Sequence, residues 1–139
     1  MTDEVDAIYT VGATMALKDI RILIVDDEVF FRQVLRDILE KIGFTVVAEA
    51  ADGNEAVEKF RVHRPHVTIM DIYMPEKNGI DATKEMVALD SRAKVLVCSA
   101  SDYDYDIQAA LDAGATLTLM KPFVPKEVYE GIKKALTGK

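Results

Sequence analysis

The chain has 139 residues, a length that fits one domain, and it combines 17 basic with 24 acidic side chains for a net charge of −7. No cluster of lysine and arginine stands out, so we expect no nucleic-acid partner. No apolar stretch approaches the roughly 20 residues that span a bilayer, and the acidic start lacks the positive region of a secretory signal. These features predict a cytoplasmic protein with no membrane partner.

Residues 1–18 differ from the rest of the chain because their apolar residues follow no clear period. We interpret them as a disordered leader or extension. A short helix that docks on the domain or on a partner is the alternative. Residues 19–139 are predicted to form one domain.

From residue 20 onward, short apolar runs rich in β-branched residues alternate with segments of helical period. The clearest helix runs from Phe31 to Ile42, where apolar residues recur at i, i+3, i+4 and i+7 and form one stripe. Further helices are expected at residues 54–63 and 103–113, and after the third and fifth strands. The five expected strands are residues 20–25, 45–50, 67–70, 94–98 and 116–120.

The predicted strands are almost continuously apolar, which indicates a sheet covered by helices on both faces. Strict alternation of strand and helix implies parallel strands joined by right-handed crossovers. We therefore predict a three-layer α/β fold. In such a sheet, ligands bind outside the carboxyl ends of the strands.

Polar and charged side chains stand at four of these strand ends. Asp26 and Asp27 follow the first strand and Asp71 follows the third. Ser99 follows the fourth strand and Lys121 the fifth. Three carboxylates would repel one another unless a cation lies between them, and Mg²⁺ binds carboxylate, carbonyl, water and phosphate oxygens. The pattern predicts a site for Mg²⁺ and a phosphoryl group, with a lysine and a hydroxyl to contact phosphoryl oxygens.

Each of these residues also has a purely structural interpretation. Asp27 and Ser99 could cap helices, Asp71 could start a turn, and Lys121 could be a solvated loop residue. These interpretations do not explain why all four strand ends carry groups that suit a phosphoryl and metal site. We therefore favour the shared site.

Five short motifs resemble those of the response regulator receiver domains of two-component systems. They are residues 22–27 (ILIVDD), 70–75 (MDIYMP), 78–79 (NG), 97–100 (VCSA) and 121–123 (KPF), in the order and spacing of that family. The resemblance extends over most of the chain after the leader. It implies a flavodoxin-like (βα)5 fold, with a five-stranded parallel sheet in the order 2-1-3-4-5.

The resemblance also implies roles for individual residues. Asp71 is the expected phospho-acceptor, which attacks the phosphorus of a phosphohistidine on a partner kinase and forms an aspartyl phosphate. Asp27 is expected to bind Mg²⁺ directly and Asp26 largely through water, while the backbone carbonyl of Tyr73 and the carboxylate of Asp71 complete the protein ligands. Lys121 is expected to pair with the phosphate and to precede a cis peptide bond to the following proline.

Ser99 matches the switch hydroxyl of the family, which bonds a phosphoryl oxygen after phosphorylation while the fourth helix shifts. The output surface is then expected on the fourth helix, the fifth strand and the fifth helix. The sequence departs from the family at Thr118, where many receivers carry Tyr or Phe, so no rotating aromatic couples to Ser99. Tyr73 and Ser101 match variable positions that influence the access of water to the phosphate.

Residues 30–32 and 46–56 look most like those of stand-alone chemotaxis regulators. This likeness implies a monomeric signalling phosphoprotein that catalyses its own phosphorylation and dephosphorylation and is not otherwise an enzyme. The implied partners are a sensor or chemotaxis histidine kinase, a downstream target such as the flagellar motor switch, and a phosphatase.

Three other functions are alternatives to this one. The first is a phosphorelay intermediate that passes its phosphate to a histidine phosphotransfer protein and shares every site residue. A phosphate-independent interaction module is more remote, because such modules typically lose an acidic or lysine residue. A phosphatase of the haloacid-dehalogenase type is disfavoured, because residues 71–73 lack its Asp-x-Asp pattern.

Overall fold

The computed structural model describes residues 7–10, 13–100 and 104–138. None of the helices in these ranges has the length and apolarity needed to span a bilayer. The strands are β1 (Ala7–Thr10), β2 (Ala13–Ala16), β3 (Arg21–Val25), β4 (Thr45–Ala50), β5 (Val67–Asp71), β6 (Val95–Ser99) and β7 (Leu117–Met120). The helices are η2 (Leu17–Asp19, a 3-10 turn), α1 (Val29–Ile42), α2 (Gly53–His63), α3 (Gly79–Leu89), α4 (Asp104–Asp112) and α5 (Pro125–Thr137).

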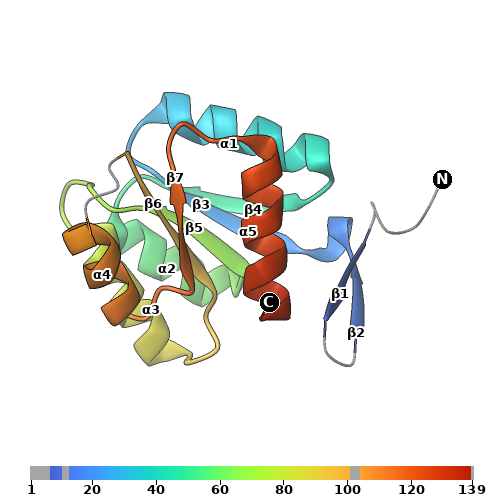
Figure 1. The fold of residues 1–139 in the computed structure, drawn as a ribbon. Helices are drawn as coiled ribbons and strands as arrows, with labels where there is room; N and C mark the ends of the chain where they lie inside the picture. Colours follow the sequence, from blue (N-terminus) through green and yellow to red (C-terminus); the bar gives the residue numbers. More distant parts are fainter. Residues whose placement is uncertain (1–6, 11–12, 101–103, 139) are drawn as a thin grey trace.

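Five parallel strands form the central sheet in the order β4-β3-β5-β6-β7. Because β3 is the first of these strands along the chain, this is the order 2-1-3-4-5, and the predicted flavodoxin-like topology is confirmed. Helices α1 and α5 cover one face of the sheet, and α2, α3 and α4 cover the other (Figure 1). The domain therefore has the three layers that the apolar strands predicted.

Alternate residues of each strand face opposite layers of the fold. In β3, Ile22 and Ile24 pack in the core shared with α1 and α5. Leu23 and Val25 pack in the core shared with α2, α3 and α4. All four are at most 2% exposed, which explains why the strand is an unbroken apolar run in the sequence.

Local signals set where the helices begin. Asp52 caps α2 and Asn78 caps α3, and each carboxylate or amide oxygen accepts a hydrogen bond from a backbone N–H of the first helical turn. Helix α1 begins at Val29, two residues before the predicted helix. Phe31 therefore lies in the first turn of α1, close to the carboxyl edge of the sheet.

The N-terminal segment differs from our expectation of a disordered leader or a short helix within residues 1–18. Strands β1 and β2 pair as an antiparallel hairpin, in which Ile8 lies opposite Met15. Ile8 is only 1% exposed and packs with Leu17 in the core shared with α1 and α5. Figure 1 shows the hairpin beside the C-terminal end of α5. Burial of these apolar side chains stabilises a structure that the weak local pattern did not predict, while the domain boundary after residue 18 stays a prediction.

Candidate functional site

The four strand ends singled out from the sequence meet at the carboxyl edge of the sheet. Asp26 directly follows β3, and Asp71 and Ser99 are the last residues of β5 and β6. Lys121 directly follows β7, and its backbone N–H donates a 3.0 Å hydrogen bond to the carbonyl of Ser99. The expected cis peptide bond between Lys121 and Pro122 is present. Parallel pairing thus brings together residues that lie up to 95 positions apart.

Asp26, Asp27 and Asp71 form an acidic cluster. One carboxylate oxygen of each residue lies within 4.8 Å of those of the other two. Asp26 and Asp71 are buried, whereas Asp27 is exposed. Three closely spaced oxygen donors suit a hard divalent cation such as Mg²⁺, which takes carboxylate oxygens, carbonyl oxygens and waters as ligands.

The ammonium group of Lys121 lies between two members of this cluster. Its Nζ donates a 2.7 Å hydrogen bond to Oδ2 of Asp26 and lies 3.3 Å from Oδ1 of Asp71. Burial lowers the pKa of Lys121, but the hydrogen bond to Asp26 and the charges of both carboxylates outweigh burial, so the pKa lies above its ordinary value. The lysine is therefore a permanent cation at neutral pH.

The surroundings of Asp71 raise the pKa of its carboxyl group. Burial raises its pKa, the charge of Lys121 opposes that rise, and the charges of Asp26 and Asp27 add to it, so that the pKa reaches about 6. Three carboxylates and one ammonium give the cluster a formal charge of −2. A divalent cation would neutralise that charge, and the donor set therefore fits one.

A cavity of about 480 Å³ opens onto the cluster. Asp71 lies in its wall between residues of α1 and of the loops that follow β3, β5, β6 and β7. The described residues that line it are Asp27, Glu28, Phe31, Asp71, Tyr73, Ala100, Lys121 and Pro122. A group of phosphoryl size can therefore approach Asp71 and Lys121 from solvent.

Helix α1 supplies two contacts that sequence reasoning missed. The Nζ of Lys121 lies 4.1 Å from the centroid of the Phe31 ring. The guanidinium of Arg32 donates a 2.5 Å hydrogen bond to the backbone carbonyl of Asp26 and pairs with Glu49 of β4 at 3.0 Å. The sequence marked these residues by their place at the start of an amphipathic helix and by their likeness to chemotaxis regulators, but neither signal predicted the two contacts.

Tyr73 and Ser99 occupy different surroundings. Ser99 is 3% exposed at the end of β6, whereas the ring of Tyr73 is largely exposed at the cavity mouth. The Tyr73 hydroxyl donates a 2.5 Å hydrogen bond to Oδ2 of Asp106 in α4, and this bond raises the pKa of Tyr73. The expected flanking residue Ser101 lies outside the described residues.

Gly79 brings α3 against the backbone of Asp71. A Cβ atom at this position would collide with the carbonyl oxygen of Asp71, so a residue without a side chain is required here. The N–H of Gly79 also donates a 2.7 Å hydrogen bond to the carbonyl of Ile72. The start of α3 therefore fixes the loop that follows β5.

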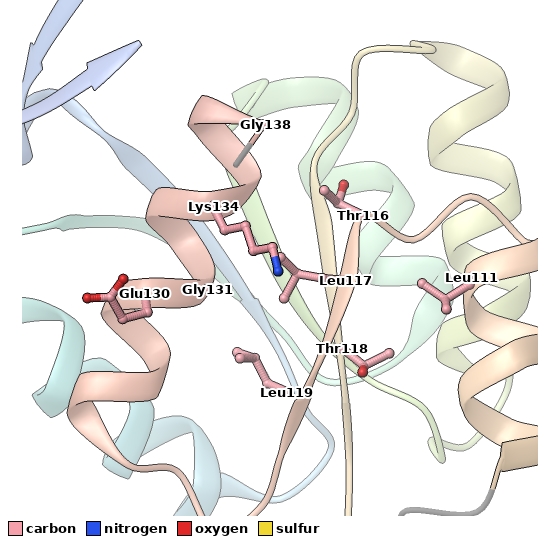
Figure 2. A pocket seen from close by; sticks show the side chains of 9 residues that line it. All are labelled: Leu111, Thr116, Leu117, Thr118, Leu119, Glu130, Gly131, Lys134 and Gly138. Carbon is pink, nitrogen blue, oxygen red and sulfur yellow. The ribbon is translucent and has the colours of Figure 1, made fainter.

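A second cavity, of about 630 Å³, lies on the surface formed by α4, β7 and α5. Figure 2 shows the side chains of Leu117, Leu119 and Lys134 on the α5 side of β7, and Thr118 and Leu111 on the α4 side. Thr118 is the position where an aromatic residue is common in receivers. Here a threonine stands at this position and forms part of the wall of the cavity.

Comparisons with known proteins agree with this geometry. Residues 22–133 match the family model described as the response regulator receiver domain. The chemotaxis protein CheY of Thermotoga maritima is 47% identical over 82% of this chain and 95% of its own length. The chemotaxis protein CheY of Bacillus subtilis is 47% identical over 84% of this chain and 97% of its own length.

A solved structure is also similar to this chain in fold and sequence. A chain in the crystal structure of the CheX-CheY-BeF3-Mg²⁺ complex from Borrelia burgdorferi matches with a TM-score of 0.79 and 32% identity, over 82% of this chain and 87% of that chain. The family match covers nearly all of the sheet and its helices. The chain therefore belongs to the response regulator receiver domain family, whose members are the phospho-acceptor switches of two-component signalling.

Proposed function

We propose that Asp71 accepts a phosphoryl group from a phosphohistidine on a histidine kinase. An Oδ atom of Asp71 forms the new bond to phosphorus, the bond from phosphorus to the imidazole nitrogen breaks, and the imidazole keeps that electron pair and stays with the kinase. The observation that supports this proposal is the position of the Asp71 carboxylate in the cavity. It lies in the wall of a solvent-open cavity, within the acidic cluster and 3.3 Å from Nζ of Lys121.

The other residues of the site would bind the metal ion and contact the phosphoryl group. Asp27 would hold Mg²⁺ directly, Asp26 largely through water, and the backbone carbonyl of Tyr73 would add a ligand. When bound, the ion would neutralise charge on the carboxylates and on the phosphoryl oxygens. Lys121 would contact a phosphoryl oxygen, because its ammonium already lies 3.3 Å from the Asp71 carboxylate that would accept the phosphoryl group.

We further propose that Ser99 carries the signal toward α4, β7 and α5. Its buried hydroxyl at the end of β6 would bond a phosphoryl oxygen, and the loop that leads into α4 would follow it. Since Thr118 supplies no rotating aromatic, the change would travel through the backbone and the loops. The hollow beside Thr118 supports an output on this surface, where a protein partner would dock.

The chemotaxis proteins among the relatives support a partner in the flagellar motor switch, with a chemotaxis kinase as the donor. Tighter binding of a motor-switch peptide after treatment with beryllofluoride, a stable phosphoryl mimic, would support this role. Transfer of phosphate from the protein to a histidine phosphotransfer protein would favour the phosphorelay role instead.

Intact mass spectrometry after incubation with Mg²⁺ and acetyl phosphate tests the chemistry. We expect one added phosphoryl group of about 80 Da per chain, which is absent in Asp71→Asn. Glu58→Ala, which changes an exposed carboxylate of α2 away from the cavity, serves as the control and should be phosphorylated normally. No addition to the wild-type chain, and no binding of beryllofluoride, would overturn the proposal.

A further inference from the structure

The ring of Phe31 forms a close contact with the buried lysine of the site. The Lys121 ammonium lies 4.1 Å from the ring centroid, and the lysine side chain is only 9% exposed. The other cation–π pair among the described residues joins Arg64 to Phe60 at 6.0 Å, and that arginine is 58% exposed. Attraction between a cation and an aromatic face is stronger when water is excluded. The contact at Phe31 is therefore the stronger of the two.

The ring differs in kind from the other partners of this ammonium. Asp26 and Asp71 hold the lysine through charge. Under the proposed function, Asp26 would contribute to holding Mg²⁺ and Asp71 would become an acyl phosphate, so both carboxylates change their charge or their partners. The Phe31 ring comes from α1, carries no net charge and stays the same through such a cycle.

We propose that Phe31 is a positioning residue for Lys121. The ring keeps the ammonium inside the cavity while the partners of the lysine change from carboxylates to a phosphoryl group. Without the ring, the four-carbon lysine chain would reach other rotamers and meet a phosphoryl oxygen less often. This inference rests on the proposed phosphorylation of Asp71.

The first test needs neither metal nor phosphate. Cε of Lys121 is bonded to an ammonium nitrogen that lies 4.1 Å from the centroid of the Phe31 ring, so we expect the NMR signals of the Cε protons to be shifted upfield by the ring current in the absence of metal. The shift should disappear in Phe31→Leu and persist in Phe31→Tyr, which keeps the ring. Phe30→Leu removes the neighbouring ring, whose centroid lies 5.5 Å from that of Phe31 and which is 70% exposed, and should leave the shift in place.

The second test measures the rate of phosphorylation by acetyl phosphate with saturating Mg²⁺. We expect Phe31→Leu to react about fivefold more slowly, in line with the loss of a desolvated cation–π contact. Phe31→Tyr and Phe30→Leu should stay within about twofold of wild type. Phe31→Met replaces Phe31→Leu if the leucine variant does not fold.

The outcomes separate this inference from the function on which it rests. A wild-type chain that is not phosphorylated contradicts the proposed function. A wild-type chain that is phosphorylated, together with a Phe31→Leu variant of equal rate, contradicts only the role of Phe31. Equal slowing in the leucine and tyrosine variants, or loss of the NMR shift without a change in rate, contradicts that role as well.

Discussion

Tyr73 and Asp106 are joined by a 2.5 Å hydrogen bond that spans 33 positions of the sequence. Tyr73 lies two residues after Asp71, and Asp106 lies in the third position of α4. The bond links the loop beside the proposed phospho-acceptor to the helix through which the signal is expected to leave. It is the direct side-chain link between these two segments among the described residues.

The Tyr73 hydroxyl should control the lifetime of the phosphorylated state. Tyr73→Phe and Asp106→Asn each weaken the bond, which frees the ring to leave the cavity mouth and admits water, so we expect each to shorten the lifetime by roughly two- to fivefold. Tyr73→Ala should act at least as strongly. The measurement is the decay of the aspartyl phosphate after the donor is removed.

A double-mutant cycle controls this prediction. If the hydroxyl and the carboxylate act through one bond, the double variant should decay no faster than the faster single variant. The rate of phosphorylation by acetyl phosphate should change less than the lifetime. Additive effects, or equal effects on both rates, would show that the bond is not the cause.

Stability of the metal-free protein should depend on pH through Asp71. Its pKa is about 6 in the fold and about 3.9 in an unfolded chain. Between these two pH values the folded state therefore binds more protons than the unfolded state, so the free energy of unfolding falls as the pH rises. The stabilisation from the protonated carboxyl is fully present below pH 4 and is lost as the pH rises through 6. Asn is neutral at every pH, so Asp71→Asn should be more stable than wild type by about 3 kcal/mol at pH 7.5.

Urea denaturation with a chelator at pH 4 to 8 checks this expectation. The difference in free energy of unfolding between Asp71→Asn and wild type should shrink toward zero as the pH falls to 4. A difference that stays constant across this range would contradict the raised pKa. Added Mg²⁺ should stabilise the wild type and so reduce the advantage of the variant at pH 7.5.

Asp27 should contribute to metal binding more than to folding. Because its side chain is exposed, Asp27→Ala should change the free energy of unfolding without metal by less than about 0.5 kcal/mol. Mg²⁺ at ten times its dissociation constant should stabilise the wild type by about 1.4 kcal/mol, and this gain should be lost in the variant. Urea midpoints with and without Mg²⁺ measure both quantities, and Glu58→Ala should respond to Mg²⁺ as the wild type does.

The N-terminal hairpin should contribute to stability through Ile8. Truncation of this 1% exposed side chain to alanine removes apolar contacts from the core shared with α1 and α5, so we expect a loss of about 2–4 kcal/mol. Tyr9→Ala, at a neighbouring position that is 54% exposed, should cost less than about 1 kcal/mol. Equal, small effects of both variants on the urea midpoint would indicate that the hairpin is not part of the folded domain.

The sheet and the acidic cluster were predictable from the sequence because they depend on few geometric rules. Continuous apolar strands require two covered faces, and the carboxyl ends of parallel strands share one edge. Asp26, Asp71, Ser99 and Lys121 each stand at such an end. Their convergence therefore follows from topology alone.

The contacts that were missed depend on the rotation of helices and on the path of loops. Phe31 reaches Lys121 because α1 begins two residues earlier than its apolar stripe indicates. Tyr73 reaches Asp106 because the loop after β5 and the first turn of α4 approach each other in space. The hairpin was missed because Ile8 and Met15 gain their stability from the tertiary core and have too short a local pattern to predict a strand.

The two sides of the cavity are held by different numbers of side-chain contacts. On one side, Arg32 ties the carbonyl of Asp26 to Glu49, which Arg36 also binds at 2.6 Å, so that loop, helix and strand are braced together. On the other side, the link to α4 is the exposed bond from Tyr73. We therefore expect a new charge at Asp71 to displace the side of the cavity formed by the loop after β5 and the start of α4. The side formed by α1 and β4 should keep its shape.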